Sequence, residues 1–231
     1  MTSTPLFDQY ADDYEKALAR GISFSGESRE YFARKRVEKT AECMYGKLSA
    51  RRILDFGCGT GDTLPMLVQA LGAESGLGVD VSAKSIELAA KRHQSSSCVF
   101  STMDACREEN TFDLAYCNGV FHHIPPEGRH SALAYVHGKL KPGGYFAFWE
   151  NNPWNPGTRL AMRRTPFDRD AITISPPAAR RLLTGAGFYI VETVSMFVFP
   201  KALNWLRFME RVILIAPIGA QYLVLTRKKF E

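Results

Sequence analysis

A turn in which glycine stands at every second position, residues 57–61, follows a short apolar run that ends near Asp55. The turn consists of Gly57, Cys58, Gly59, Thr60 and Gly61. Glycine lets the backbone come very close to a ligand because it carries no side chain. A second acidic residue, Asp80, ends the next β-like run, about one βα unit later. This arrangement predicts a site for a nucleotide-type cofactor.

The glycine spacing differs from the dinucleotide fingerprint G-x-G-x-x-G, because the third glycine comes one residue early, at Gly61. The turn therefore has no feature that is specific for binding a pyrophosphate. An acidic residue at the end of the first strand can bind a cationic ammonium group, directly or through water. Asp55 lies at that position. Asp80, at the end of the second strand, can accept two hydrogen bonds from ribose hydroxyls. The ligand expected here is S-adenosylmethionine rather than NAD.

Three further blocks follow in the chain after the glycine turn and the segment around Asp80. They are Met103-Asp104-Ala105, Phe112 to Ile124 and Leu140-Lys141-Pro142-Gly143-Gly144. Together the five blocks resemble the ordered motifs of the class I S-adenosylmethionine-dependent methyltransferases, strongly over residues 50–150 and weakly elsewhere. The resemblance implies S-adenosyl-L-methionine as the cofactor and methyl transfer as the activity.

The resemblance also implies which residues contact the cofactor. Asp55 and the glycines of the turn would form the methionine side of the pocket, and Asp80 would hold the ribose. Asp104 would face the adenine amino group, and Asn118 would lie beside the sulfonium. The expected contacts also include Cys58, Thr60, Val81, Met103, Ala105 and Gly119.

An aromatic residue and an arginine near the N-terminus are expected over the methionine end, where the guanidinium would pair with the carboxylate. Tyr31 and Arg36 fill these roles in a segment that reads as a helix about one turn long. The alternative is that this segment is an ordinary surface helix.

His122 and His123 are the candidate catalytic residues, because they follow the fourth expected strand, where the family places the methyl donor beside the acceptor. An ordinary pKa near 6.5 suits either one as a base. A base is needed only if the acceptor is protonated and weakly acidic. Equally, the pair could pack against the cofactor or hold a loop. A metal is not expected, because neighbours on an extended segment point to opposite faces and no carboxylate stands close by in the sequence.

β-like runs alternate with helical patterns from residue 51 to 144, which predicts an α/β fold with a doubly wound, seven-stranded, mostly parallel sheet. The expected strands are 52–56, 76–80, 98–102, 112–117, 144–150, 188–197 and 221–227. The expected helices are 62–71, 83–93, 127–140 and 178–184. In the family's arrangement the seventh strand is inserted antiparallel between the fifth and the sixth.

We expect a single methyltransferase domain over residues 1–231. Its parts would be an N-terminal helical cap segment (1–49), the cofactor-binding core (50–150), cap insertions with the sixth strand (151–218) and the last strand (219–231). The segments outside the core are expected to bind the acceptor, through Tyr14, Trp154, Arg163 and Arg164. The guanidinium group of arginine can donate two hydrogen bonds to the oxygens of a carboxylate or phosphate, which would suit an anionic acceptor. The alternative is that these arginines lie on a solvated helix face.

An apolar stretch at residues 199–218 is expected mainly to pack against the sheet. The alternatives are that it forms a hydrophobic pocket for the acceptor or a helix that lies at a membrane interface. The favoured acceptor is a small molecule, methylated at an oxygen of an anionic or amphiphilic metabolite. RNA or protein as acceptor, and a protein that binds the cofactor without turnover, stay open as alternatives. The basic residues do not follow an RNA-binding signature, so nucleic acid is not the expected partner.

Composition limits the remaining possibilities. The 231 residues carry a formal charge of +5, which is mild for this length. Five cysteines without a C-x-x-C pair indicate neither a disulfide framework nor a zinc site, and a reducing cytoplasm is the simplest compartment. The longest apolar run is too short to span a bilayer, which leaves peripheral membrane contact open. The oligomeric state, monomer or homodimer, is not decided.

Overall fold

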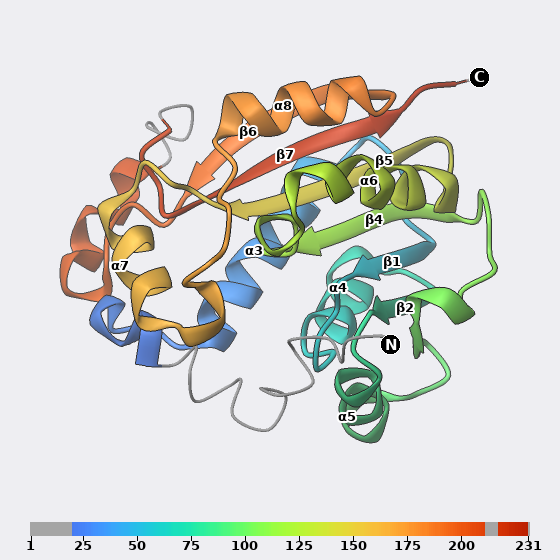
Figure 1. The fold of residues 1–231 in the computed structure, drawn as a ribbon, viewed down its shortest axis with the longest axis horizontal. Helices are drawn as coiled ribbons and strands as arrows, with labels where there is room; N and C mark the ends of the chain where they lie inside the picture. Colours follow the sequence, from blue (N-terminus) through green and yellow to red (C-terminus); the bar gives the residue numbers. More distant parts are fainter. Residues whose placement is uncertain (1–19, 211–216, 231) are drawn as a thin grey trace.

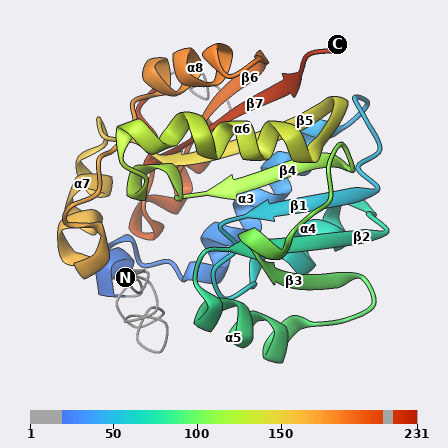
Figure 2. The ribbon, with the colours of Figure 1, turned by 45° about the vertical axis from the view of Figure 1, so that its right-hand side comes forward.

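One sheet forms the centre of the computed structural model, which describes residues 20–210 and 217–230 (Figure 1). Its strands are β1 (Arg52–Phe56), β2 (Ser75–Asp80), β3 (Cys98–Thr102), β4 (Phe112–Asn118), β5 (Leu140–Asn151), β6 (Phe188–Met196) and β7 (Gln221–Lys228). The seven strands within the described residues follow the order β3-β2-β1-β4-β5-β7-β6 (Figure 2). β7 lies antiparallel between β5 and β6, which confirms the predicted fold class and topology.

The helices are α3 (Arg29–Met44), α4 (Thr63–Leu71), α5 (Ala83–His93), α6 (Arg129–Lys139), α7 (Pro156–Arg164) and α8 (Pro176–Gly185). Short 3₁₀ helices are η1 (Ser23–Ser25), η2 (Met103–Ala105), η3 (Phe121–His123), η4 (Pro126–Gly128), η5 (Pro166–Asp168) and η6 (Lys201–Met209). The four helices expected from the sequence are present: α5 has the predicted bounds, and the ends of the other three differ from the predicted ones by at most two residues.

Two hydrophobic cores lie on the two faces of the sheet, because successive strand residues point to opposite faces. Ile53 of β1 packs in one core with Val37 of α3, Leu64 of α4 and Ile86 of α5. The next residue, Leu54, lies in the other core, to which α6 and α8 contribute. Helices therefore cover both faces of the sheet, as Figures 1 and 2 show.

The carboxyl ends of β1, β2 and β4 meet at one edge of the sheet, because these strands are parallel neighbours. β4 is buried from Phe112 to Cys117, as a mainly apolar central strand of a parallel sheet should be, and its one acid, Asp113, accepts the N–H groups of Arg51 and Arg52. The register places Asp55 of β1 opposite Tyr116 of β4. Asp55, Asp80 and Asn118, each at or next to a strand end, are therefore brought to one edge.

The prediction of a helix about one turn long around Tyr31 is wrong, since α3 has 16 residues. The side chain of Ser28 caps its N-terminus by accepting a hydrogen bond from the Tyr31 N–H at 3.1 Å. Farther along, the indole N–H of Trp149 donates to the hydroxyl of Thr40 at 3.0 Å. Packing against the sheet thus extends the helix well beyond what the local pattern indicated.

The apolar stretch at residues 199–218 was expected to pack mainly against the sheet, and its described part does not. In η6, Trp205 and Phe208 are 67% and 70% exposed. Residues 211–216 of this stretch lie outside the described part. In the described residues, no helix has the length and apolar character required to cross a membrane.

Candidate cofactor and acceptor site

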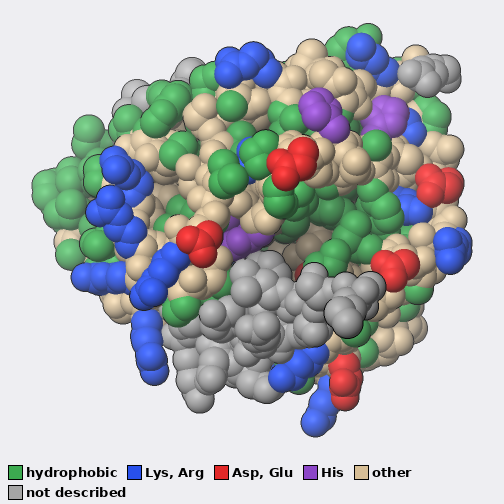
Figure 3. Space-filling view, in the orientation of Figure 1, with side chains coloured by type: hydrophobic (Ala, Val, Ile, Leu, Met, Phe, Trp, Pro, Cys, Tyr) green, Lys and Arg blue, Asp and Glu red, His purple; other side chains and the backbone are tan. Residues whose placement is uncertain are grey.

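A cavity of about 950 Å³ opens at the carboxyl ends of β1 and β4. Its walls come from the glycine turn, α3, η3, α7, η5 and the segment that leads into β7. Figure 3 shows a hollow on this face of the molecule, bordered by hydrophobic side chains. Ligands of open α/β sheets bind outside the carboxyl ends of the strands, so this is the expected place for a cofactor.

The glycine turn forms one wall of the cavity, with its backbone tied to β2. The N–H groups of Gly57 and Cys58 donate to the carbonyl of Val79 at 2.8 and 3.0 Å. Gly59 has a φ of +53°, in the left-handed region that favours glycine, and a Cβ built on it would meet no described atom within 4 Å. A side chain at this position would therefore project into open space, which a ligand can use instead.

Asp55 is buried in the cavity wall and is only 3% exposed. Among the described residues its Oδ2 atom has no hydrogen-bond partner. Burial, together with the carboxylate of Asp80, raises the pKa of Asp55 to about 7, although Arg36 acts in the opposite direction. A buried carboxylate oxygen without a hydrogen-bond partner is costly, so this position fits a cationic group of a ligand.

Asn118, at the end of β4, lines the same cavity, and its Oδ1 atom also has no hydrogen-bond partner among the described residues. Its neighbour Gly119 lines the cavity too. Two buried acceptor atoms on adjacent strands, Oδ2 of Asp55 and Oδ1 of Asn118, can thus accept hydrogen bonds from a ligand or lie against its positive charge. These two acceptor atoms fit the ammonium and sulfonium of S-adenosylmethionine. Nε of Arg36 and the hydroxyl of Tyr116, which likewise have no hydrogen-bond partner among the described residues, line the same cavity.

Asp80 holds the glycine turn against β2. Its carboxylate accepts the N–H of Gly59 and the N–H of Ser82, each at 2.9 Å. It is not itself a wall of the cavity, and its contact with a ribose stays a prediction. The other predicted cofactor contacts outside the cavity wall are Gly61, Val81, Met103, Asp104 and Ala105.

Tyr31 and Arg36 both reach the cavity from α3. Arg36 is 8% exposed and donates from Nη1 to Oε1 of Gln221 at 2.8 Å. The guanidinium of Arg207 lies 5.1 Å from the centre of the Tyr31 ring. The idea that this segment is an ordinary surface helix is therefore wrong for Arg36, while its pairing with the methionine carboxylate stays a prediction.

The predicted acceptor-binding residues Trp154, Arg163 and Arg164 do not line the cavity. α7 buries Thr158 and Met162, which are one turn apart, and its three arginines, Arg159, Arg163 and Arg164, are exposed. Figure 3 shows basic side chains gathered on the α7 side of the molecule. Trp154 is 52% exposed. The fourth predicted residue, Tyr14, lies outside the described residues.

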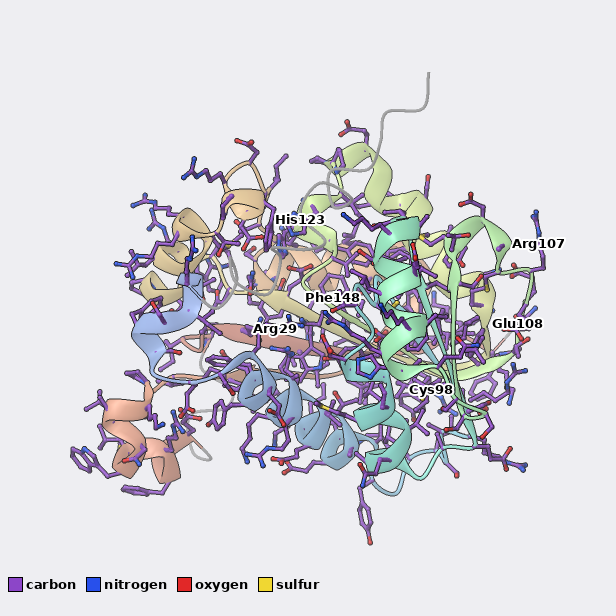
Figure 4. The ribbon with its side chains drawn as sticks, turned by 90° about the horizontal axis from the view of Figure 1, so that it is seen from below. Arg29, Cys98, Arg107, Glu108, His123 and Phe148 are labelled. Atoms are coloured by element: carbon purple, nitrogen blue, oxygen red, sulfur yellow. The ribbon has the colours of Figure 1, made fainter. Side chains whose placement is uncertain are left out.

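His122 and His123 lie in η3 and not on an extended segment, which corrects the argument that they face opposite ways. Their ring centres are 4.1 Å apart. Both turn an Nε2 atom toward Oδ1 of Asp168 in η5, at 3.6 Å for His122 and 3.2 Å for His123. The carboxylate that the neighbouring sequence lacks comes from 45 positions along the chain. Figure 4 shows His123 on the α7 side of the molecule, away from Arg107 and Glu108.

Glu150, fully buried at the end of β5, anchors this histidine pair. Its Oε1 accepts the N–H of Phe121 at 2.7 Å, and its Oε2 lies 2.6 Å from Nδ1 of His122. Burial works to lower the pKa of His122, but the carboxylates of Glu150 and Asp168 outweigh it and raise the pKa to about 10. The interpretation that His122 has an ordinary pKa is therefore wrong, and without a ligand it is protonated at neutral pH.

Sequence reasoning missed both carboxylates of this cluster. Glu150 carries the same signal as Asp55 and Asp80, an acidic residue at the carboxyl end of a buried strand. Asp168 carries no signal of its own, because the sequence shows it only as a charge among arginines.

Comparisons with known proteins agree with this geometry. Residues 53–144 match the family model of a methyltransferase domain. Over 75 residues the chain is 31% identical to a trans-aconitate 2-methyltransferase of Rhizobium etli, covering 32% of this chain and 29% of that protein. Over 111 residues it is 34% identical to a phthiotriol/phenolphthiotriol dimycocerosates methyltransferase of Mycobacterium leprae, covering 47% and 40%. The chain spans between 25% and 57% of the length of eight curated relatives that it matches.

Solved structures show the same fold. One is the complex between the Trm112 methyltransferase activator of Haloferax volcanii and a methyltransferase, with a TM-score of 0.67, 18% identity and coverage of 97% and 98% of the two chains. Another is a SAM-dependent methyltransferase from Thermotoga maritima, with a TM-score of 0.65, 18% identity and coverage of 96% and 98%.

The chain therefore has the Rossmann-like fold of S-adenosylmethionine-dependent methyltransferases of known structure, and its residues 53–144 match a methyltransferase domain. The cofactor of this family is S-adenosyl-L-methionine, which the unpartnered acceptor atoms of Asp55 and Asn118 fit.

Proposed function

We propose that this protein binds S-adenosylmethionine in the cavity and catalyses transfer of its methyl group to an oxygen of a small molecule. The observation that carries the proposal is the pair of buried, unpartnered acceptor atoms, Oδ2 of Asp55 and Oδ1 of Asn118, beside the open space at Gly59. Burying unpaired acceptors costs free energy, which a cationic ligand would recover. A neutral ligand would leave the negative charge of the Asp55 carboxylate without a compensating positive charge.

The protein's main contribution to this reaction is alignment. S-adenosylmethionine, when bound, supplies a methyl group on a sulfonium whose sulfur leaves as a neutral thioether. The glycine turn and α3 hold one side of the cavity, while η3 and η5 hold the other. Holding an acceptor lone pair opposite the leaving sulfur can supply much of the rate, because the reaction is an in-line displacement.

The acceptor that best suits the cavity is amphiphilic. Aromatic side chains wall the region beyond the glycine turn: Phe24, Tyr31, Phe32, Phe167, Phe197 and Phe199. Two of the cavity arginines already have acidic partners, Arg29 with Asp62 at 2.6 Å and Arg207 with Glu27 at 3.0 Å, and the third, Arg36, is expected to pair with the methionine carboxylate of the cofactor. An apolar body with one hydroxyl therefore fits better than a polyanion. Among the relatives, the name of the Mycobacterium leprae protein points to a lipid-like acceptor and that of the Rhizobium etli protein to an anion.

Calorimetric titration tests the cofactor assignment. We expect the purified chain to bind S-adenosylmethionine and S-adenosylhomocysteine and to bind NAD weakly or not at all. Asp55→Asn should weaken binding of S-adenosylmethionine by thirtyfold or more, because it removes one partner of a buried charge pair. Asp113→Asn is the matched control, since Asp113 is a buried carboxylate that ties β4 to Arg51, Arg52 and Lys141 and lines no part of the cavity.

Tight binding of NAD without a response to the adenosyl ligands would overturn the proposal. A screen of hydroxylated amphiphilic metabolites with a labelled methyl donor tests the acceptor class. Binding of the cofactor without any transfer would favour a non-catalytic binding protein. An RNA acceptor would instead show activity that falls steeply as salt rises.

A further inference from the structure

Three potential metal ligands meet at the cavity wall, in a cluster that methyl transfer by alignment does not use. They are the two Nε2 atoms of His122 and His123 and one carboxylate oxygen of Asp168. One potential ligand atom from each of the three residues lies within 4.8 Å of the other two. All three residues line the cavity.

The spacing of these atoms suits a transition-metal ion. An ion about 2.0–2.1 Å from each ligand holds tetrahedral ligands about 3.3 Å apart. The two distances to Asp168 Oδ1, 3.6 Å from His122 and 3.2 Å from His123, bracket that value. Small side-chain movements would complete the geometry.

Glu150 supplies the outer support that metal-binding histidines ordinarily have. Its Oε2 lies 2.6 Å from Nδ1 of His122, and both side chains are buried. A carboxylate on one ring nitrogen fixes the ring and leaves the other nitrogen for the ion.

We propose that His122, His123 and Asp168 form a binding site for one divalent first-row transition-metal cation. Two imidazoles and one carboxylate suit zinc, iron, cobalt or manganese. The three residues line the cavity, so an ion that they hold can polarise an oxygen of an acceptor bound there. That role rests on the proposed function, whereas binding of the ion does not.

Titration of the full chain with Co²⁺ tests the site. The protein is stripped with a chelator, dialysed and titrated without S-adenosylmethionine, with visible absorption and calorimetry as readouts. We expect one Co²⁺ per chain with a ligand-field spectrum, and displacement by Zn²⁺. His123→Gln and Asp168→Asn should each weaken binding at least tenfold, and Glu150→Gln tenfold to a hundredfold.

His93→Gln is the matched control. His93 lies in the same cavity, and its Nε2 is 3.1 Å from Oδ1 of Asp62, so the variant removes a histidine–carboxylate pair outside the cluster. Its Co²⁺ affinity should match the wild type. His123 is 15% exposed at the side chain, so its substitution disturbs the core less than that of His122. Thermal melting checks that each variant is folded.

Absence of stoichiometric Co²⁺ binding by the wild-type chain would overturn the proposal, whatever the variants do. So would unchanged affinity in both His123→Gln and Asp168→Asn, or an equal loss in His93→Gln. The cluster would then be a hydrogen-bonded network that fixes η3 against η5. Normal Co²⁺ binding with no binding of S-adenosylmethionine would refute the proposed function and leave the ion site standing.

Discussion

Asp55→Asn should make the cofactor-free protein more stable at pH 8, although it removes a residue assigned to cofactor binding. Asp55 is buried, its Oδ2 has no partner among the described residues, and its pKa is raised to about 7 by burial and by Asp80. In the absence of a ligand, the ionised carboxylate therefore destabilises the fold. Asparagine has nearly the same shape and carries no charge at any pH.

The raised pKa sets the size of the effect and its dependence on pH. With an ordinary value of 3.8 and a value of about 7 in the folded chain, ionising Asp55 costs the folded state about 4 kcal/mol more than the unfolded state. The folded state holds this proton more tightly, so the carboxyl's contribution to stability is lost as the pH rises from about 4 to 7. The variant should thus exceed the wild type by about 1.5 kcal/mol at pH 5 and by up to about 4 kcal/mol at pH 8.

Urea unfolding of the cofactor-free protein at several pH values between 5 and 8 measures this difference. Asp113→Asn provides the contrast, because its carboxylate accepts the N–H groups of Arg51 and Arg52 and pairs with Lys141. That variant should lose about 1–3 kcal/mol at pH 8. A free energy of unfolding for Asp55→Asn below that of the wild type at pH 8, or a difference that does not grow with pH, would refute the reasoning.

Three other outcomes follow from the site. The affinity of the wild type for S-adenosylmethionine should fall by up to tenfold per pH unit below about pH 7, because the cationic ligand binds the ionised form of Asp55. Equal affinity at pH 6 and pH 8, measured by calorimetry, would contradict this. Gly59→Ala should weaken cofactor binding at least tenfold and cost about 1 kcal/mol of stability, since its Cβ would enter the open space at a φ of +53°; undiminished binding would place the cofactor elsewhere. Trp154→Ala and Arg163→Ala should change cofactor affinity and methyl transfer less than twofold, because both residues lie outside the cavity wall; a tenfold loss in either assay would argue against this cavity.

Part of the cavity wall could be predicted from the sequence because its signals are local, whereas the predicted contacts Asp104 and Ala105 lie outside that wall. Gly59 and Asp55 lie on one turn and the strand before it, and their spacing alone indicates a backbone that approaches a ligand beside an acid. The topology could be predicted for a similar reason, since alternating β-like and helical runs allow few arrangements. Even the antiparallel insertion of β7 followed from the family resemblance.

The acceptor half could not be predicted because its contacts join distant parts of the chain. Arg163 looked like an anion-binding residue by composition, but α7 turns its Met162 face inward and leaves the arginine in solvent. Trp205 looked like core and is 67% exposed. Local patterns indicate which residue types a segment contains, whereas tertiary packing decides which face of the segment meets the cavity.

The histidine pair shows how a correct choice of residues can be joined to a wrong premise about local geometry. His122 and His123 were singled out as the residues nearest the acceptor, and metal binding was set aside because adjacent residues on an extended segment diverge. A 3₁₀ turn does not separate neighbours in that way, since each residue advances about 120° around the axis. η3 thereby allows both rings to meet Asp168, and Glu150 keeps one of them in place. A carboxylate brought from η5 thus changes an apparent base into part of a cluster of potential metal ligands.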